Sequence, residues 1–524
     1  MATNALLVAL MSGAACAAPS ERTGTVVYAT GADLEGANPI TTVHPLARQV
    51  QRHALLVTLT RYDSLLKPSP YFARRWTWSA DRRVLSFALD SSLYWHDGVR
   101  TTARDAAFTL RAVMDPTSAS PRAADVAAID SVTAPDDTTL TIFFRSPQPA
   151  LSTVFSELPI APRHLLASVA PRDLRRASFN TAPVGNGPFR FLRRDPGQRW
   201  IFDRNPAFPK SLGGPPSIER LVVTLVDEPT TKFAGLVSGD LDVAGIAPSM
   251  AALVDRDPAL RTIAYPVLAT QVLVFNTARP PLDDIRVRRA IDVAIDRARL
   301  VRVALAGFGT PADGAIPPEH PAWTASARSP ARIADSLLDA AGWTRGSGAI
   351  RSKGRAPLAF TLLTVGSGDN SIEQLIQADL RAHGIDMSIR QLELGAFLAI
   401  ARAPAKEFDA LITLVPGDLG LAYLRGMFDG ALSGGALDYA GFHTAQLDSA
   451  FGAVRASTDA RGERTAWQHV QRLLSESLPV TWLYHARGVQ GVSRQLSGVV
   501  MDLRGELVTI SRWTRAGTTR DPLP

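Results

Sequence analysis

The stretch from residue 358 to residue 389 constrains the fold most strongly, because its hydrophobic period changes twice. Residues 358–363 form an apolar run of strand length, and residues 371–383 show helical spacing that ends at Gly384. Residues 385–389 then alternate between apolar and polar side chains, as a strand does. A strand, a helix and a strand at this spacing predict a right-handed βαβ unit, and therefore an α/β fold with parallel strands.

The same patterns continue along most of the chain. Predicted strands lie at residues 25–30, 84–89, 130–134, 139–144, 189–192, 200–204, 221–226, 272–275, 408–415 and 480–484. Predicted helices lie at residues 52–62, 103–114, 230–238, 285–305, 331–341 and 464–474. Thr102 and Asp105 have the spacing of a capping box before the second of these helices.

The length of the chain requires more than one hydrophobic core. It has 524 residues, whereas a single core rarely grows beyond about 300. Its hydrophobic fraction of 46% and charged fraction of 20% are typical of a folded globular protein and exclude a disordered one. We therefore expect two or three domains.

The net charge of +7 does not come from a nucleic-acid-binding surface. The basic residues are mostly arginines spread along the whole chain, and the densest cluster, Arg172, Arg175 and Arg176, is short and lacks interleaved aromatic residues. A nucleic-acid-binding protein would concentrate them on one element. We expect no nucleic acid among the partners.

The N-terminus has the pattern of an export signal. Residues 5–11 are apolar, residues 12–15 are small, and Cys16, the one cysteine of the chain, follows them. This order resembles the lipobox of bacterial lipoproteins, in which the cysteine carries a lipid anchor, although Gly13 stands where leucine is usual. Two endings stay open: lipid attachment at Cys16, or ordinary cleavage after Ala17. Residues 1–23 are expected to be a signal peptide and linker, and the protein is expected in the periplasm or on the outer face of the membrane.

The sequence offers no set of catalytic residues. No two of the nine histidines have the four-residue spacing of a metal-binding helix, and no Gly-x-Ser-x-Gly elbow or nucleotide-binding glycine loop occurs. Trp95-His96-Asp97-Gly98 is interpreted as a structural turn. We therefore expect no enzyme activity, no metal and no cofactor.

An ordered series of short motifs resembles the extracytoplasmic solute-binding proteins of family 5, the peptide-, nickel- and related binders of ABC importers. The series spans about residues 25–500, and each motif follows the last in the family's order. The matching positions include Tyr62-Asp63, Leu65-Leu66, Trp76, Trp95 to Gly98, Gly185 to Phe189, Arg204 to Pro206, Ser238 to Asp242, Asn276, Pro281, Ala341-Gly342 and Gly384-Ile385.

The resemblance implies a two-lobed periplasmic-binding-protein-like fold of class II, in the three-domain variant with an extra domain inserted in lobe one. Domain I would comprise residues 24–60, 184–275 and 486–515, domain II residues 61–183, and domain III residues 276–485. Crossovers near residues 275–277 and 484–486 would form a hinge, and the lobes would close over a ligand.

The resemblance also implies a function as the substrate-binding component of an ABC importer. A monomer would capture a small ligand, expected to be a dipeptide or oligopeptide, and deliver it to membrane permease subunits. A nickel chelate, haem, opine or oligosaccharide in the same fold stays open as the alternative. An exported hydrolase and a signalling receptor are weaker alternatives.

Asp418 is the first candidate for ligand contact. In the family's peptide binders an aspartate at the corresponding place receives the α-ammonium group of the ligand, but this chain lacks the tryptophan that usually precedes it. Gly417 would let the backbone approach the ligand closely. Arg425 is a candidate for a ligand carboxylate, and Asp33 lies where the domain I contacts of the family are found.

Overall fold

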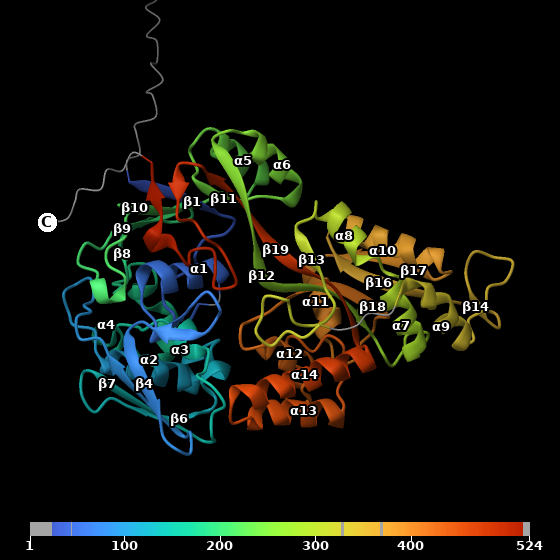
Figure 1. Ribbon diagram of the computed structural model, residues 1–524, viewed down its shortest axis with the longest axis horizontal. Helices are drawn as coiled ribbons and strands as arrows, with labels where there is room; N and C mark the ends of the chain where they lie inside the picture. The colour runs from blue at the N-terminus through green and yellow to red at the C-terminus, as the bar shows by residue number, and fades with distance from the viewer. Residues whose placement is uncertain (1–23, 43, 326–329, 367–369, 517–524) are drawn as a thin grey trace, which may run out of the picture.

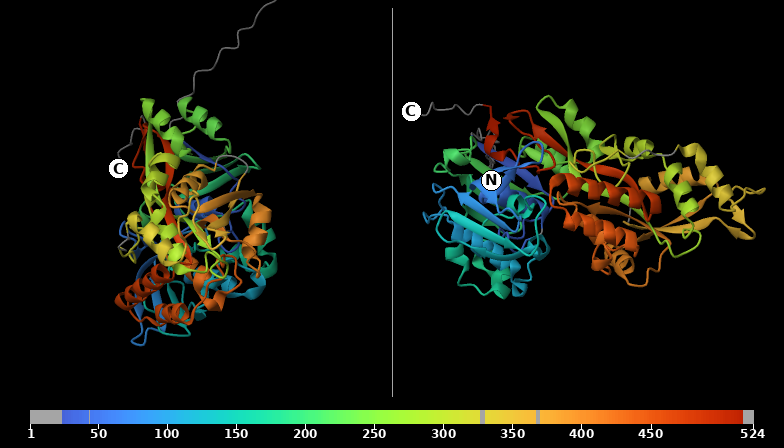
Figure 2. Two further views of the ribbon diagram at one scale, coloured as in Figure 1. Left: turned by 90° about the vertical axis from the view of Figure 1, so that its right-hand side faces the viewer. Right: turned by 60° about the horizontal axis from the view of Figure 1, so that its bottom comes forward.

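The chain folds into two lobes that lie side by side and share one continuous sheet (Figures 1 and 2). The structure is a computed structural model that describes residues 24–42, 44–325, 330–366 and 370–516. Lobe one comprises the described residues up to 266 and from 487 onward, and lobe two comprises the described residues between 267 and 486. The α/β class and the two-lobed architecture that the sequence predicts are confirmed.

Eleven strands form the shared sheet, which runs in the order β17-β16-β18-β12-β19-β11-β1-β10-β9-β8, with β13 paired to β19. Their bounds are β17 (Asp386–Leu392), β16 (Ala359–Val365), β18 (Ala410–Pro416), β12 (Leu260–Phe275), β19 (Val480–Ser493), β11 (Val243–Gly245), β1 (Thr25–Thr30), β10 (Arg220–Leu225), β9 (Arg199–Arg204), β8 (Phe189–Asp195) and β13 (Gly309–Pro311).

Lobe two is a sheet with a hydrophobic core on each face. Along β12, Val272 and Val274 belong to one core, and Leu273 and Phe275 belong to the other. This division follows from the alternation of side chains along a strand, and the continuous apolar run is typical of a strand buried on both faces. The predicted βαβ unit is confirmed, since β16 and β17 pair in parallel with α10 between them.

The helices of lobe two cover both faces of its sheet (Figure 1). They are α7 (Ile285–Ala294), α8 (Arg297–Ala304), α9 (Ala334–Ala340), α10 (Ser371–Ala382), α11 (Leu394–Arg402), α12 (Ala422–Phe428), α13 (Ala445–Ala456) and α14 (Ala460–Ser477). The pair α13 and α14 packs through Phe451 and Trp467, whose rings meet edge to face at 6.2 Å.

Lobe one combines a parallel and an antiparallel region. β1 pairs in parallel with β10 and β11, and β8 and β9 form the predicted antiparallel hairpin. The helices of this lobe are α1 (Pro45–Val50), α2 (Ala103–Met114), α3 (Val154–Glu157), α4 (Arg163–Leu166), α5 (Pro229–Val237) and α6 (Ala251–Arg256).

Residues 61–183 contribute a separate four-stranded antiparallel sheet to lobe one. Its order is β4 (Ala73–Trp78), β5 (Val84–Leu89), β7 (Thr139–Phe144) and β6 (Ile129–Thr133), and the capping box of Thr102 and Asp105 begins α2 beside it. A short pair, β2 (Thr60–Tyr62) and β3 (Pro68–Pro70), precedes it. One continuous core joins this sheet to the rest of lobe one.

A buried carboxylate ties this region together. Asp90 is almost fully buried and accepts hydrogen bonds from Ser92, Arg74 and Ser211. Burial acts to raise the pKa of Asp90, but these hydrogen bonds prevail and hold it at about 2. The charged form of Asp90 therefore stabilises the fold.

The Gly185-Asn186-Gly187-Pro188 turn needs its glycines because it lies against the backbone of residues 54–55. A Cβ atom on Gly185 would lie 2.1 Å from the carbonyl oxygen of Leu55, and one on Gly187 would lie 2.5 Å from that of Ala54. His96 reaches the same turn, with its Nε2 3.0 Å from the Gly187 carbonyl oxygen, and Trp95 is buried beside it. The predicted turn at residues 95–98 is confirmed, since the Gly98 N–H donates to the Trp95 carbonyl oxygen.

Two long strands connect the lobes. β12 and β19 pair antiparallel from Leu260↔Ser493 to Val274↔Val480, with a register shift between Pro266 and Thr270. The sequence predicts only the lobe-two ends of these strands, residues 272–275 and 480–484. It misses the rest because the pattern of apolar residues changes where each strand passes from one hydrophobic core to the next. Tyr265 packs in the core of lobe one, whereas Val272 packs in a core of lobe two.

Two helix predictions are wrong in detail. Residues 285–305 form two helices, since the chain leaves the helical conformation at Ile295 and the Asp296 side chain accepts the Arg299 backbone N–H to begin α8. Residues 52–62 form a π-helical turn, Gln51–Leu55, and the strand β2. Leu56, Val57 and Leu59 follow this turn as buried chain outside a helix, although their spacing over so short a stretch resembles a helical one.

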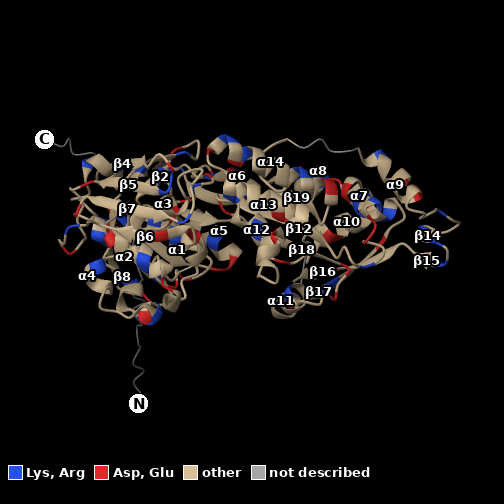
Figure 3. Ribbon diagram, turned by 90° about the horizontal axis from the view of Figure 1, so that it is seen from below, with Lys and Arg blue, Asp and Glu red and all other residues tan. Residues whose placement is uncertain are grey.

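Charges are distributed over both lobes. Figure 3 shows basic and acidic residues interspersed along the ribbon of both lobes, without a run of basic residues along one element. Among the described helices, none has both the length and the apolar character needed to cross a membrane. The predicted signal segment, with Cys16, lies outside the described residues.

Candidate ligand-binding site

The loop after β18 places Asp418 at the start of α12. The Asp418 carboxylate accepts hydrogen bonds from the backbone N–H groups of Gly420 at 2.8 Å, Ala422 at 3.1 Å and Tyr423 at 3.1 Å. Burial raises the pKa of Asp418, and the three backbone hydrogen bonds oppose that rise. The carboxylate thus caps a helix and is partly withdrawn from water.

Gly417 holds this loop against the strand that connects the lobes. Its N–H donates to the carbonyl oxygen of Leu268 at 2.7 Å, and Leu268 lies at the register shift of β12. A Cβ atom on Gly417 would lie 3.3 Å from Leu268 and from the Tyr423 ring, a tight approach. Glycine is therefore the residue that best lets the loop pack so closely beside the connecting strands.

The same loop reaches lobe one. A Cβ atom on Gly420 would lie 3.5 Å from the Oγ1 atom of Thr153, the residue before α3. Charges also interact across the interface. Burial raises the pKa of Tyr62 most, and the charge of Asp418 contributes to that rise. The charge of Asp125 in turn contributes to the raised pKa of Asp418. The loop that carries Asp418 therefore lies against lobe one at Thr153.

An arginine cluster, Arg48, Arg52 and Arg122, lies on the lobe-one side of this interface around Glu157. Arg48 and Arg52 form ion pairs with the Glu157 carboxylate, at 3.2 Å for Arg48, and Arg122 donates to the Glu157 carbonyl oxygen at 2.9 Å. Burial and the charge of Arg122 lower the pKa of Arg48. Sequence reasoning missed this cluster, because its members are far apart in the chain.

A second polar cluster lies at the lobe-one end of β12 and β19. The Tyr265 hydroxyl donates to Glu506 at 2.7 Å, and the Tyr28 hydroxyl also donates to Glu506. Gln490 Nε2 lies 3.3 Å from both tyrosine hydroxyls. A Cβ atom on Gly488 would lie 2.1 Å from Tyr265 Cζ, so the ring fills the space over that glycine. No local sequence pattern indicates this cluster either, because its members lie far apart in the chain.

The other two predicted contact residues are held by protein partners. Arg425 lies 3.2 Å from the buried Asp429 carboxylate, which Arg455 also contacts at 2.6 Å. Asp33 follows β1 and accepts hydrogen bonds from Arg194 at 2.6 Å and from the Trp200 indole at 2.8 Å. The structure thus brings Gly417 and Asp418 together, and gives Arg425 and Asp33 separate partners. No group of three or more potential metal ligands occurs within the described residues.

Comparison with known proteins agrees with this architecture. The sequence of Protein XP55 from Streptomyces lividans is 28% identical over 450 residues, covering 84% of this chain and 80% of that protein. The nickel-binding periplasmic protein of Escherichia coli is 28% identical over 344 residues, covering 63% of this chain and 64% of its own.

A solved structure has the same fold. The oligopeptide-binding protein AppA from Bacillus subtilis, in complex with a nonapeptide, superposes with a TM-score of 0.73 at 20% identity, covering 94% of this chain and 99% of that one. The family model for the bacterial extracellular solute-binding proteins, family 5 Middle, matches residues 67–424. Because that match spans most of a chain with this two-lobed fold, the protein belongs to the bacterial extracellular solute-binding proteins of family 5.

Proposed function

We propose that the chain is the substrate-binding component of an ABC importer, which captures a peptide between its lobes and delivers it to membrane permease subunits. The position of Asp418 carries the proposal. This carboxylate belongs to a loop of lobe two that lies against lobe one beside the connecting strands. A partly buried carboxylate is a suitable partner for the α-ammonium group of a peptide, because a desolvated charge must be paired.

Gly417 is proposed as the second contact, since it fixes the loop that carries Asp418. Arg425 and Asp33 remain predicted contacts, and each would share its present partner, Asp429 or Arg194, with the ligand. For the hinge we propose residues 266–270 and 485–487, where β12 shifts register against β19 and the buried core changes lobes. The expected domain boundary near residue 275 would then move to this shift.

A non-peptide ligand is the second candidate. The match with a nickel-binding periplasmic protein favours it, as does the absence of the tryptophan that precedes the aspartate in the family's peptide binders. Haem, an opine or an oligosaccharide would also fit a fold that does not determine its ligand.

Calorimetric titration separates these candidates. A panel of dipeptides to pentapeptides is compared with nickel–histidine complexes and with oligosaccharides. A peptide importer component binds some peptides without changing them, and at about 100 times Kd the ligand stabilises the fold by roughly 2.7 kcal/mol. If only nickel–histidine or an oligosaccharide gives a binding heat and stabilises the protein, the second candidate is correct.

The location follows from the family together with the N-terminal pattern. The family is extracellular, and we propose that Cys16 carries a lipid that anchors a monomer to the outer face of the membrane. Stable retention of this kind needs more than one acyl chain.

A further inference from the structure

A cavity of about 450 Å³ lies in lobe one, outside the contacts of Asp418 described above. Its size is within the range of small-molecule sites. Three segments provide most of its lining, residues 52–71, residues 208–214 and the C-terminal residues 504–512, and Ser156 and Pro188 complete it. Its wall includes four arginines, Arg52, Arg61, Arg504 and Arg512, and one acidic residue, Asp63.

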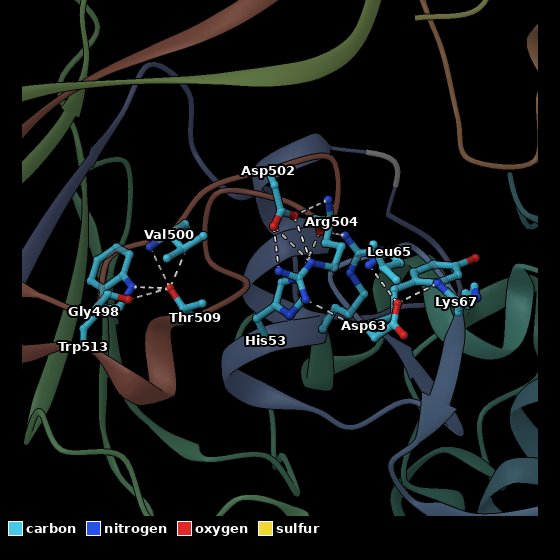
Figure 4. Close-up of polar contacts among 12 residues, drawn as sticks. His53, Asp63, Leu65, Lys67, Gly498, Val500, Asp502, Arg504, Thr509 and Trp513 are labelled. Atoms are coloured by element: carbon cyan, nitrogen blue, oxygen red, sulfur yellow. Dashed lines mark hydrogen bonds and ion pairs between the residues drawn. The ribbon is translucent and has the colours of Figure 1, made fainter. Parts of the chain in front are cut away.

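The floor of this basic pocket is held rigidly. Arg504 makes a two-pronged ion pair with Asp502, with Nε to Oδ1 at 2.9 Å and Nη2 to Oδ2 at 2.6 Å (Figure 4). The Arg504 carbonyl oxygen accepts from Arg52 at 2.8 Å and lies 3.3 Å from His53 Nε2. Burial, together with the charge of Arg52, lowers the pKa of His53 well below its usual value, so that ring is neutral.

Two of the arginines keep their charges available. Arg61 lies with its guanidinium 5.1 Å from the centre of the Tyr71 ring, and both Arg61 and Arg512 are exposed. Neither has an ion-pair partner within the described residues. The Asp63 carboxylate is bound by its own loop, because its Oδ1 accepts the backbone N–H groups of Leu65 and Lys67, both at 2.9 Å (Figure 4).

Hydroxyl groups complete the wall. Those of Ser64, Tyr71 and Ser511 line the pocket, whereas the Thr509 hydroxyl already bonds to the Gly498 and Val500 carbonyl oxygens. Arginines with nearby hydroxyls form the donor set that recognises an oxyanion, since guanidinium groups bind carboxylates through paired hydrogen bonds. Arg52 is nine-tenths buried, and its Nε atom has no hydrogen-bond partner within the described part of the chain.

The pocket adjoins the interlobe contact. Ser156 and Tyr62 line it, and Ser156 lies in α3, whose preceding residue, Thr153, packs against Gly420 of lobe two. Arg52 lines the pocket and pairs with Glu157, the centre of the arginine cluster. A ligand at Asp418 could therefore extend past α3 toward the pocket.

We infer that this basic pocket is a subsite for a carboxylate of the bound ligand, so that the protein prefers peptides with an acidic side chain. The inference rests on the proposed function for the peptide, but the pocket can be tested without it. A carboxylate with two arginines should gain about tenfold or more in affinity over its neutral amide.

The test is calorimetric titration with Ala-Ala-Glu-Ala and Ala-Ala-Gln-Ala. Wild type should bind the acidic peptide at least about tenfold more tightly, as expected of a charge-assisted hydrogen bond. The double variant Arg61→Ala/Arg512→Ala should lose that preference and keep its affinity for the neutral peptide. Arg355→Ala, an exposed arginine of lobe two without an ion pair in the described residues, is the matched control and should keep the preference. Equal affinities of wild type for both peptides would overturn the inference.

A second arm uses free glutarate and inorganic phosphate. If no peptide binds, the proposed function fails, and the pocket is judged by glutarate alone. Thermal stabilisation of wild type by glutarate, absent in the double variant, would support a carboxylate site. Stabilisation by phosphate but not glutarate, or by neither, would overturn it.

Discussion

Replacement of Asp418 separates its role in the fold from its role in the ligand site. Asp418→Ala removes the acceptor of three backbone N–H groups at the start of α12, whereas Asp418→Asn keeps one carbonyl oxygen and the shape. Loss of a helix cap costs about 1 kcal/mol, with a range of roughly 0.5–2. The alanine variant should lose about that free energy of unfolding, and the asparagine variant should lose less.

The effect on binding should be much larger. If Asp418 pairs with the α-ammonium group of a peptide between the lobes, removing its charge breaks a desolvated ion pair, which typically costs on the order of 3–5 kcal/mol. Both variants should then bind free peptides at least about a hundredfold more weakly. N-acetylated peptides, which lack the ammonium group, should bind wild type poorly and be little affected by either substitution.

Calorimetric titration measures the affinities, and urea unfolding measures the stabilities. Asp459→Ala is the matched control, because Asp459 caps α14 of the same lobe by accepting the N–H groups of Arg461 and Gly462 at 2.9 and 2.8 Å. It should lower stability by a similar amount and leave peptide affinity unchanged. Equal affinities of wild type for free and acetylated peptides would refute the role of Asp418 in the site.

Three further predictions concern the fold and the N-terminus. Gly488→Ala should destabilise the protein by about 1–3 kcal/mol in urea unfolding, because the new Cβ would overlap the buried Tyr265 ring. The control Gly462→Ala, within α14, should not destabilise the protein. Equal effects of the two substitutions would contradict the packing argument. The folded-state pKa of Asp90, about 2, is lower than its unfolded value, so its contribution of about 2 kcal/mol is present above about pH 5 and lost as pH falls toward 2. The Asp90→Asn variant should therefore have a lower free energy of unfolding near neutral pH, and that free energy should change less between about pH 5 and 2. An unchanged dependence of the free energy of unfolding on acid pH would contradict this assignment. Cys16→Ser should release the protein from the membrane fraction, and a wild type that is already soluble after cell disruption would favour ordinary cleavage instead.

Elements with a strong local pattern could be predicted from the sequence. β1, β5 and β7 have the expected bounds, and the capping box of Thr102 and Asp105 begins α2 where its spacing indicates. In these segments burial alternates with the period of the element, so local sequence and tertiary packing agree. The connecting strands were predicted only in part, because they pass from one core to another.

The candidate site was predictable only where one short segment carries it. Gly417 and Asp418 are neighbours in the loop after an apolar strand, and the resemblance to the family's peptide binders indicates that segment. The arginine cluster and the basic pocket each combine segments that are far apart in the sequence. Only the packing of the inserted sheet and of the C-terminal segment on lobe one creates them.

Native mass spectrometry of the protein incubated with a mixed peptide library tests most directly whether a peptide is held at Asp418. The account predicts one peptide per chain in wild type, released unchanged when the protein is denatured, and a large loss of that complex in Asp418→Asn. Peptide complexes that survive equally in Asp418→Asn, or a wild type that takes up nickel–histidine and no peptide, would contradict it.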